Sequence, residues 1–445
     1  MCGNFLVILF CLTTHVDAVI NRHTNEKSQP YEYFNTKTLY DRVRGKLPND
    51  HSEVPKGCNL VHIVLLSRHG SRYPGKEDYE IMKTFYDITA ILNSTGNAEL
   101  SFKYLQKLRN WKIWFDDTVD DETLAPTGYS EIHGITRRLA KAFPEILSKE
   151  KLDANKYRII SSNTTRTIQS SKAFLDGIFN TAKSRPNIEI DDMLLHSDQH
   201  CRKWIKSVRE NLTVTVEAQK FLNSSYVSSI VEKVSKRLGI QQSHLSNELI
   251  QFLKKEGCAE QEWATGKPSP WCSVFKKPDL QVLEYYEDLE NYFTKSFPHK
   301  VNYKQSCQLK NFILSALNNA SSDSELLGHF LFGHSFTLMS TMTEMKLIQN
   351  DGPFTSANYL QKKNRKYRTS FYTPGSANLI FLLYECGEDK KKKLKIFMNE
   401  KFINMPLDKP AGELWDLDDA LEYYRFKNQK NCQWRKICDK IDNTL

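Results

Sequence analysis

Four short apolar runs, far apart along the chain, most strongly restrict what this sequence can fold into. Runs of four to eight apolar residues bounded by turns are typical of strands buried on both faces of a sheet. Elsewhere apolar side chains recur at helical spacing, as over residues 78–112, and residues 195–315 are mostly helical in pattern. Strands that alternate with helices at both ends of a chain predict an α/β fold, a sheet with flanking helices, carrying a mostly helical inserted domain. The apolar runs are residues 60–66, 157–160, 326–332 and 378–384, and residues 394–398 are expected to pair with the last of them.

The N-terminus predicts a signal peptide. Its apolar stretch, Phe5 to Leu12, is too short to span a bilayer and precedes a small-residue cleavage site at Ala18, although the usual positive start is missing. No later stretch is apolar for the roughly 18 residues that a membrane span requires, so no stable membrane span is expected. The predicted parts of the chain are residues 1–18 (signal peptide), 19–56 (irregular N-terminal arm), 57–190 with 318–445 (α/β domain) and 191–317 (helical insertion).

Eight cysteines lie outside the predicted signal peptide, an even number spread along the chain. In a secreted protein such a set predicts four disulfides. A zinc site is the alternative, but no C-x-x-C pair is present, and His196 and His200 beside Cys201 lack a second pair of ligands. We therefore expect a secreted, extracellular protein without a bound metal. The cysteines are Cys58, Cys201, Cys258, Cys272, Cys307, Cys386, Cys432 and Cys438.

The sequence predicts a glycosylated protein with a net positive charge. Five N-x-S/T sequons agree with the secretory route, and that at Asn163 is expected to stay unmodified if its loop faces a pocket. The net charge of +9 fits either a soluble basic protein or one that attracts an anionic substrate. Nucleic acid is not an expected partner, because no basic patch of a known module is present, and the oligomeric state stays open. Glycosylation is expected at Asn93, Asn211, Asn223 and Asn319.

Three of the apolar runs end in arginine or histidine side chains. Arg68, His69 and Arg72 follow the first run, Arg166 follows the second, and His334 follows the third. Ligands bind beyond the carboxyl ends of strands in open α/β sheets, so three parallel neighbouring strands would bring these groups together. Three guanidiniums favour a multiply charged anion, and they push an imidazole towards its neutral, nucleophilic form. Singly, Arg166 could be a surface helix residue and His334 a core histidine.

The segment R-H-G-S-R-Y-P, residues 68–74, resembles the R-H-G-x-R-x-P signature of the histidine acid phosphatases. The resemblance is closest to the multiple inositol polyphosphate phosphatases, a phytase-like branch, and extends from about Cys58 to Cys438. It is supported by L-A-P-T-G (124–128), S-S-N-T-T-R-T (161–167), S-P-W-C-S-V-F (269–275), L-E-Y-Y-E-D-L (283–289) and N-L-I-F-L-L-Y-E-C (378–386).

The resemblance implies a role for each strand-end residue. His69 would take the phosphoryl group and form a phosphohistidine, Arg68, Arg72 and Arg166 would clamp its oxygens, and His334 would donate to it. No cofactor is implied, and the expected partners are small anionic phosphate esters. Lys76 and Arg368 are further candidates for substrate binding. The family pattern also implies the disulfides Cys58–Cys386, Cys258–Cys272 and Cys432–Cys438, which leaves Cys201–Cys307.

The chain departs from the family pattern at the proton donor. Relatives carry a carboxylic acid one or two positions after the second histidine, whereas this chain has Ser335 and Phe336 there. Loss of a general acid typically costs ~10²- to 10⁴-fold in rate. Two functions therefore stay open, a phosphatase that draws the proton from elsewhere and a weakened or inactive protein that binds phosphate esters.

Overall fold

The structure is a computed structural model. It describes residues 32–47, 54–92, 97–118, 120–178, 186–263, 268–406, 414–425 and 432–439. The predicted signal peptide and the sequon at Asn93 lie outside the described residues, as does much of the predicted N-terminal arm. No helix of the described part is long and apolar enough to cross a membrane.

Within the described residues, eight strands form one mixed sheet in the order β3-β2-β4-β1-β5-β6-β7, and β8 pairs with β6. The three strands whose ends carry arginine or histidine, β2, β4 and β1, are adjacent and parallel, which is the arrangement that would bring their end groups together. β5 runs antiparallel to β1 and forms a hairpin with β6. The strands are β1 (Cys58–Arg68), β2 (Tyr157–Ser161), β3 (Ile188–Ile190), β4 (Gly328–Gly333), β5 (Asn378–Cys386), β6 (Lys391–Met398), β7 (Lys401–Phe402) and β8 (Trp415–Asp416).

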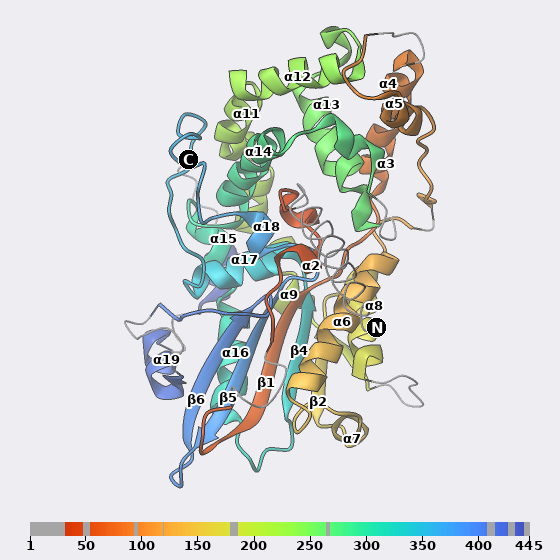
Figure 1. Cartoon of the computed structure of the whole chain (residues 1–445). Coiled ribbons are helices and arrows are strands. Elements are labelled where there is room, and N and C mark those ends of the chain that lie inside the picture. Colours follow the sequence, from red (N-terminus) through yellow and green to blue (C-terminus); the bar gives the residue numbers. More distant parts are fainter. Residues whose placement is uncertain are drawn as a thin grey trace, which may run out of the picture.

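Both faces of the central sheet are buried, which explains why its strands are continuous apolar runs. Along β1, Ile63 and Leu65 point into one core and Val64 and Leu66 into the other. The first core lies between the sheet and helices α6 (Pro126–Ala142) and α8 (Thr165–Ile178), which cover one face in Figure 1. Helix α16 (Cys307–Asn319) packs on the opposite face. The prediction of a sheet with flanking helices is confirmed.

A group of helices gathers beyond one end of the sheet, as Figure 1 shows. It draws on two separate parts of the chain, because helices α3 to α5, which precede β2, pack against helices that follow β3. Phe85 of α4, for example, contacts Trp271 with ring centroids 5.2 Å apart. These helices are α3 (Lys76–Lys83), α4 (Phe85–Ile91), α5 (Phe102–Arg109), α11 (Val216–Leu222), α12 (Ser225–Leu238), α13 (Asn247–Phe252) and α14 (Lys277–Lys295).

Shorter helices connect the larger elements. They are α2 (Tyr40–Val43), α7 (Lys149–Asp153), α9 (Asp192–Leu195), α10 (Arg202–Trp204), α15 (Lys300–Lys304), α18 (Thr369–Tyr372), α19 (Leu417–Tyr423) and α20 (Trp434–Cys438), and the longer α17 (Ser335–Glu344) follows β4 directly.

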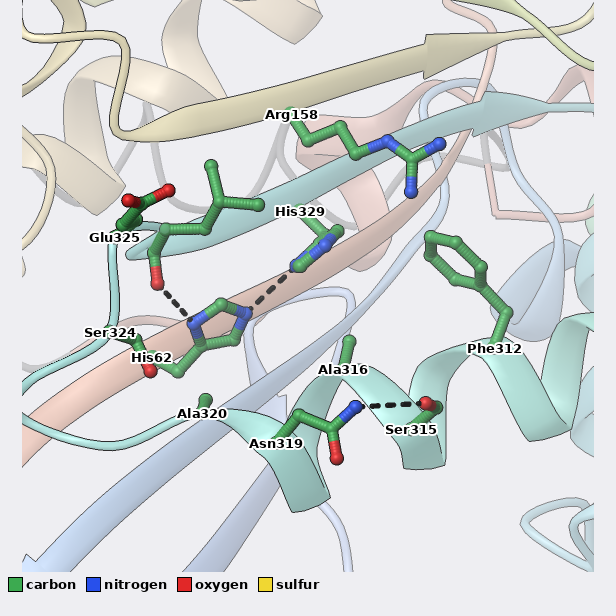
Figure 2. Close-up of a pocket in the computed structure, with 11 residues that line it drawn as sticks. His62, Arg158, Phe312, Ser315, Ala316, Asn319, Ala320, Ser324, Glu325 and His329 are labelled. Atoms are coloured by element: carbon green, nitrogen blue, oxygen red, sulfur yellow. Dashed lines mark hydrogen bonds between the residues drawn. The ribbon is translucent and has the colours of Figure 1, made fainter.

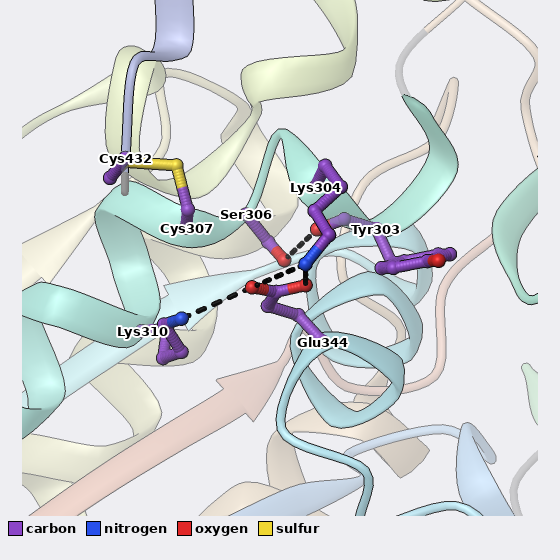
Figure 3. Close-up of a disulfide and its surroundings, with 7 residues drawn as sticks. All are labelled: Tyr303, Lys304, Ser306, Cys307, Lys310, Glu344 and Cys432. Carbon is purple, nitrogen blue, oxygen red and sulfur yellow. Dashed lines mark hydrogen bonds and ion pairs between the residues drawn. A yellow bond between two sulfur atoms is a disulfide. The ribbon is translucent and has the colours of Figure 1, made fainter. Parts of the chain in front are cut away.

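Two of the four predicted disulfides are confirmed and two are wrong. Cys58–Cys386 joins paired residues of β1 and β5, and Cys258–Cys272 closes a loop in the helical group. Cys432 and Cys438 do not pair with each other, because they lie at opposite ends of the segment that contains α20. Each reaches a different neighbour, and the bonds that form are Cys201–Cys438 and Cys307–Cys432, the second of which is drawn in Figure 3.

Charged contacts next to the second of these disulfides fix α17. Figure 3 shows Glu344, the last residue of α17, between Lys304 and Lys310. The distances from its carboxylate to the two ammonium groups are 3.0 and 3.1 Å. The C-terminal end of helix α17 is thereby held against α15 and α16.

Candidate active site

The loop that follows β1 is held in place by close backbone packing. A Cβ atom at Gly70 would lie 2.5 Å from the carbonyl oxygen of Gly128, and one at Gly128 would lie 2.1 Å from that of Ser71. The loop and the N-terminus of α6 therefore approach each other more closely than any larger residue permits. This contact accounts for the glycine in both R-H-G-S-R-Y-P and L-A-P-T-G.

A buried carboxylate beneath the loop fixes it further. Glu131 of α6 accepts hydrogen bonds from the backbone N–H of Ser71 at 3.2 Å, the hydroxyl of Ser71 at 3.0 Å and that of Ser376 at 2.8 Å. Burial raises the pKa of Glu131. The sequence analysis did not single out this residue, because a glutamate in a helix usually lies on the surface.

His69 is oriented as a nucleophile. Its Nδ1 lies 2.8 Å from the carbonyl oxygen of Gly70. Because a carbonyl oxygen only accepts, Nδ1 must donate, and in the neutral ring the lone pair is then on Nε2. Burial first, and then the positive charges of Arg68 and Arg166, lower the pKa of His69 well below its usual value. The imidazole is therefore neutral and keeps a free electron pair.

Arg68, Arg72 and Arg166 form the cationic part of the site. Arg68 is buried, its Nη1 donates to the carbonyl oxygens of Thr36 and Thr373, and burial lowers its pKa to about 10. In the part of the chain that the structure describes, Nε of Arg68 and Nε of Arg166 are buried without a hydrogen-bond partner. Such donors favour an anion with several acceptor oxygens.

Glu122 lies between the other two arginines. Its carboxylate is 3.2 Å from Nη2 of Arg72 and 2.7 Å from Nη1 of Arg166. The sequence analysis missed Glu122, since nothing near it in the sequence marks a partner for two arginines. An anion that binds the clamp has to compete with this carboxylate.

His334 faces His69 across the site, with the two ring centroids 5.6 Å apart. Its Nε2 is 3.0 Å from the hydroxyl oxygen of Ser162, which follows β2. His196, considered above as a possible zinc ligand, instead stacks on His334 with centroids 3.9 Å apart. Burial first, and then His196 and the clamp arginines, lower the pKa of His334. The two site histidines are both neutral.

The two candidate substrate-binding residues have different surroundings. Lys76 is exposed at the first position of α3, and its backbone N–H donates to Asp121. Arg368 is paired with Glu284 at 2.8 Å and also donates to the carbonyl oxygen of Glu32. A substrate would have to compete with Glu284 for Arg368, whereas Lys76 is directly accessible.

The two positions where relatives carry an acid point in different directions. Phe336 is 5% exposed and packs on Trp204, with ring centroids 4.9 Å apart, in a separate apolar cluster. The hydroxyl of Ser335 instead lies 3.4 Å from Nζ of Lys295, the last residue of α14. Sequence reasoning missed Lys295, because it lies 40 residues before Ser335 and no local motif contains it.

A cavity elsewhere on the sheet contains none of these side chains. Figure 2 shows His62 and His329 in it, with 2.9 Å between Nε2 of His62 and Nδ1 of His329. The cavity has a volume of about 490 Å³ and lies between α16 and the sheet. It is separate from the residues that follow the strand ends.

Comparison with known proteins agrees with this site. A family model described as the histidine phosphatase superfamily (branch 2) matches residues 59–399. The chain is 28% identical over 442 residues to multiple inositol polyphosphate phosphatase 1 of Homo sapiens, and the match covers 92% of this chain and 88% of the human protein.

Solved structures share the fold at lower identity. The phytase from D. castellii is 17% identical with a TM-score of 0.76, and the match covers 94% of this chain and 90% of the phytase. The multiple inositol polyphosphate phosphatase of Bifidobacterium longum, solved in complex with inositol hexasulfate, is 13% identical with a TM-score of 0.67. That match covers 88% of this chain and 97% of the bacterial protein.

Proposed function

The chain belongs to the histidine phosphatase superfamily (branch 2), and on that premise we propose that it is a secreted phosphomonoesterase acting through a phosphohistidine intermediate. The observation that carries this proposal is the contact between Nδ1 of His69 and the carbonyl oxygen of Gly70. Because Nδ1 donates to that carbonyl, the lone pair of the neutral ring is on Nε2, and the positive charges of Arg68 and Arg166 act on this ring. This combination pairs a neutral nucleophile with a site for a multiply charged electrophile.

The reaction would proceed in two displacements at phosphorus. In the first, Nε2 of His69 attacks, the bond from phosphorus to the ester oxygen breaks, and its electron pair and a proton go to the leaving oxygen. Arg68, Arg72 and Arg166 would hold the three remaining oxygens, with His334 as a further donor. In the second, water attacks phosphorus and gives up a proton to a base, the phosphorus–nitrogen bond breaks, and His69 recovers its electron pair.

Inositol polyphosphates are the proposed substrates. The human relative is named for them, and the Bifidobacterium longum relative was solved with an inositol hexasulfate. The net charge of +9 and the accessible ammonium of Lys76 near the end of the loop would favour a ring with many phosphates. Arg368 would contribute only if such a substrate displaced Glu284.

Secretion is supported by the disulfides and by the exposure of the glycosylation sequons. Four disulfides within the described residues fit an oxidising compartment. The sequon residues Asn223 and Asn319 are exposed and Asn211 is partly exposed, so these three are accessible for glycosylation. Asn163 is exposed as well, in the segment between β2 and α8 that leads to Arg166.

Phosphate release from inositol hexakisphosphate by the purified protein tests the function. We expect release by the wild type, loss of release in His69→Ala, and retention in His244→Ala, which changes an exposed histidine. Incubation with radiolabelled substrate followed by alkaline denaturation should trap label on the wild type only. Full activity of His69→Ala would reject the mechanism. Calorimetric phosphate binding without any release would identify the protein as the inactive binder instead.

A further inference from the structure

The leaving oxygen of the proposed reaction needs a proton, and the two residues after His334 cannot supply it. An alkyl alkoxide is a poor leaving group, so a positioned acid normally contributes ~10²- to 10⁴-fold. The hydroxyl of Ser335 is too weak an acid, and Phe336 is turned into the apolar cluster around Trp204. A positioned side-chain acid would therefore have to come from another part of the chain.

Lys295 occupies the place beside Ser335. It ends α14, and its Nζ lies 3.4 Å from Oγ of Ser335, directly after His334. The side chain is half-buried and, within the described residues, makes no ion pair. A lysine without a carboxylate partner at the margin of an anion site keeps available the N–H groups that it does not donate to Ser335.

The charges around Lys295 favour release of a proton. Burial has the largest effect on the pKa of Lys295 and the charge of Arg68 the next largest, and together they lower it to about 8. The carboxylates of Asp198, Glu290 and Glu287 act in the opposite direction and raise this pKa. The positive end of the α17 dipole adjoins Ser335 and acts in the same direction as Arg68. The group is protonated at neutral pH and gives up its proton more readily than an ordinary lysine.

We propose that Lys295 is the acid that protonates the leaving oxygen in place of the missing carboxylic acid, and that it serves as the base in the second step. This assignment rests on the phosphatase function proposed above. In the first displacement a proton passes from the ammonium of Lys295 to the ester oxygen, which leaves as an alcohol, and the amine becomes neutral. In the second, the attacking water gives its proton to that amine. The ammonium is restored, so the cycle balances.

A change of leaving group tests the assignment. Glycerol 2-phosphate and p-nitrophenyl phosphate each carry one phosphate, but only the first releases an alkoxide that requires a proton. We expect Lys295→Met to lower kcat/KM for glycerol 2-phosphate by ~10²- to 10⁴-fold and to lower it far less for p-nitrophenyl phosphate. Lys295→Arg should resemble Lys295→Met with glycerol 2-phosphate, because a guanidinium keeps the charge but does not give up its proton.

Three controls separate the alternatives. Lys300→Met removes one exposed positive charge five residues away and should keep the wild-type ratio between the substrates. Thermal unfolding and calorimetric binding of inorganic phosphate establish that each variant is folded with an intact clamp. Asp198→Asn tests the nearby buried carboxyl, whose pKa burial raises.

The outcomes distinguish this assignment from the proposed function. Three results would overturn the role of Lys295 and leave the phosphatase function intact. They are equal losses of activity on both substrates in Lys295→Met, full activity of Lys295→Arg, and a loss confined to glycerol 2-phosphate in Asp198→Asn. A wild type that hydrolyses p-nitrophenyl phosphate but not glycerol 2-phosphate would do the same. Absence of His69-dependent release from both substrates would overturn the function as well.

Discussion

Substitution of Glu122 by glutamine should tighten phosphate binding. The carboxylate of Glu122 pairs with Arg72 and Arg166 at 3.2 and 2.7 Å, and its side chain is 42% exposed. Arg72 and Arg166 are only 20% and 16% exposed, but at the exposed-pair value of about 0.2 to 1 kcal/mol each the two pairs together oppose the bound anion by about 0.4 to 2 kcal/mol. At 1.4 kcal/mol for each tenfold change, Glu122→Gln should bind inorganic phosphate ~2- to 30-fold more tightly.

The assay is the inhibition constant of inorganic phosphate, supported by calorimetry on the His69→Ala background, where no turnover is expected. Glu77→Gln is the matched control, because Glu77 is an exposed acid in the first turn of α3 and its loss changes the net charge equally. The effect of Glu122→Gln should also shrink with added salt, as exposed pairs are screened. Weaker phosphate binding in Glu122→Gln would refute the reasoning, since it would mean that Glu122 orients the arginines and does not compete with the ligand.

Three further predictions concern packing, burial and the covalent structure. Phe336→Glu should destabilise the protein in urea unfolding at neutral pH, because it places a carboxylate on Trp204 in an apolar cluster, and a stable, more active variant would contradict this. Burial raises the pKa of Glu290 to about 7, so its contribution to stability is present below about pH 4.3 and is lost as the pH rises through 7. The stability of Glu290→Gln relative to the wild type should therefore rise between pH 5 and pH 8, by at most about 3 kcal/mol of unfolding free energy, and this rise can be followed as a growing difference in Tm. A Tm difference that does not change with pH would contradict this prediction. Peptide mapping without reduction should recover Cys201–Cys438 and Cys307–Cys432, whereas a Cys432–Cys438 peptide would contradict the fold around α20.

The sequence predicted the sheet and the convergence of its strand ends because both depend on short-range patterns. Strands buried on both faces must be apolar throughout, which is why residues 60–66 and 326–332 stand out in a polar chain. Once those strands are parallel neighbours, the side chains that follow them have to meet at one edge of the sheet. His69 and His334 are accordingly 5.6 Å apart between ring centroids, although they are far apart in the sequence.

Features that depend on long-range packing were not predictable in the same way. The partners of Cys201, Cys307, Cys432 and Cys438 are decided by where α20 lies, and spacing along the chain carries no information about that. The role of a charged helix residue is equally hard to predict from sequence. A lysine at the C-terminal end of a helix is normally solvated and is stabilised there by the helix dipole, whatever its function. Only the contact between the ends of α14 and α17 distinguishes Lys295 from other terminal lysines.

The position of Lys295 also links proton transfer to substrate binding. In the free protein, burial and then repulsion from the charge of Arg68 lower the pKa of Lys295 to about 8. A bound phosphate ester brings negative charge next to both groups, so the pKa of Lys295 should rise in the complex and the acid should stay protonated when the leaving oxygen departs. With glycerol 2-phosphate, kcat/KM should therefore fall above about pH 8, the pKa of the free protein, whereas kcat should fall only at higher pH. If kcat/KM and kcat fell at the same alkaline pH, the titrating group would not be one that the substrate contacts. If the alkaline fall persisted in Lys295→Met, the titrating group would not be Lys295.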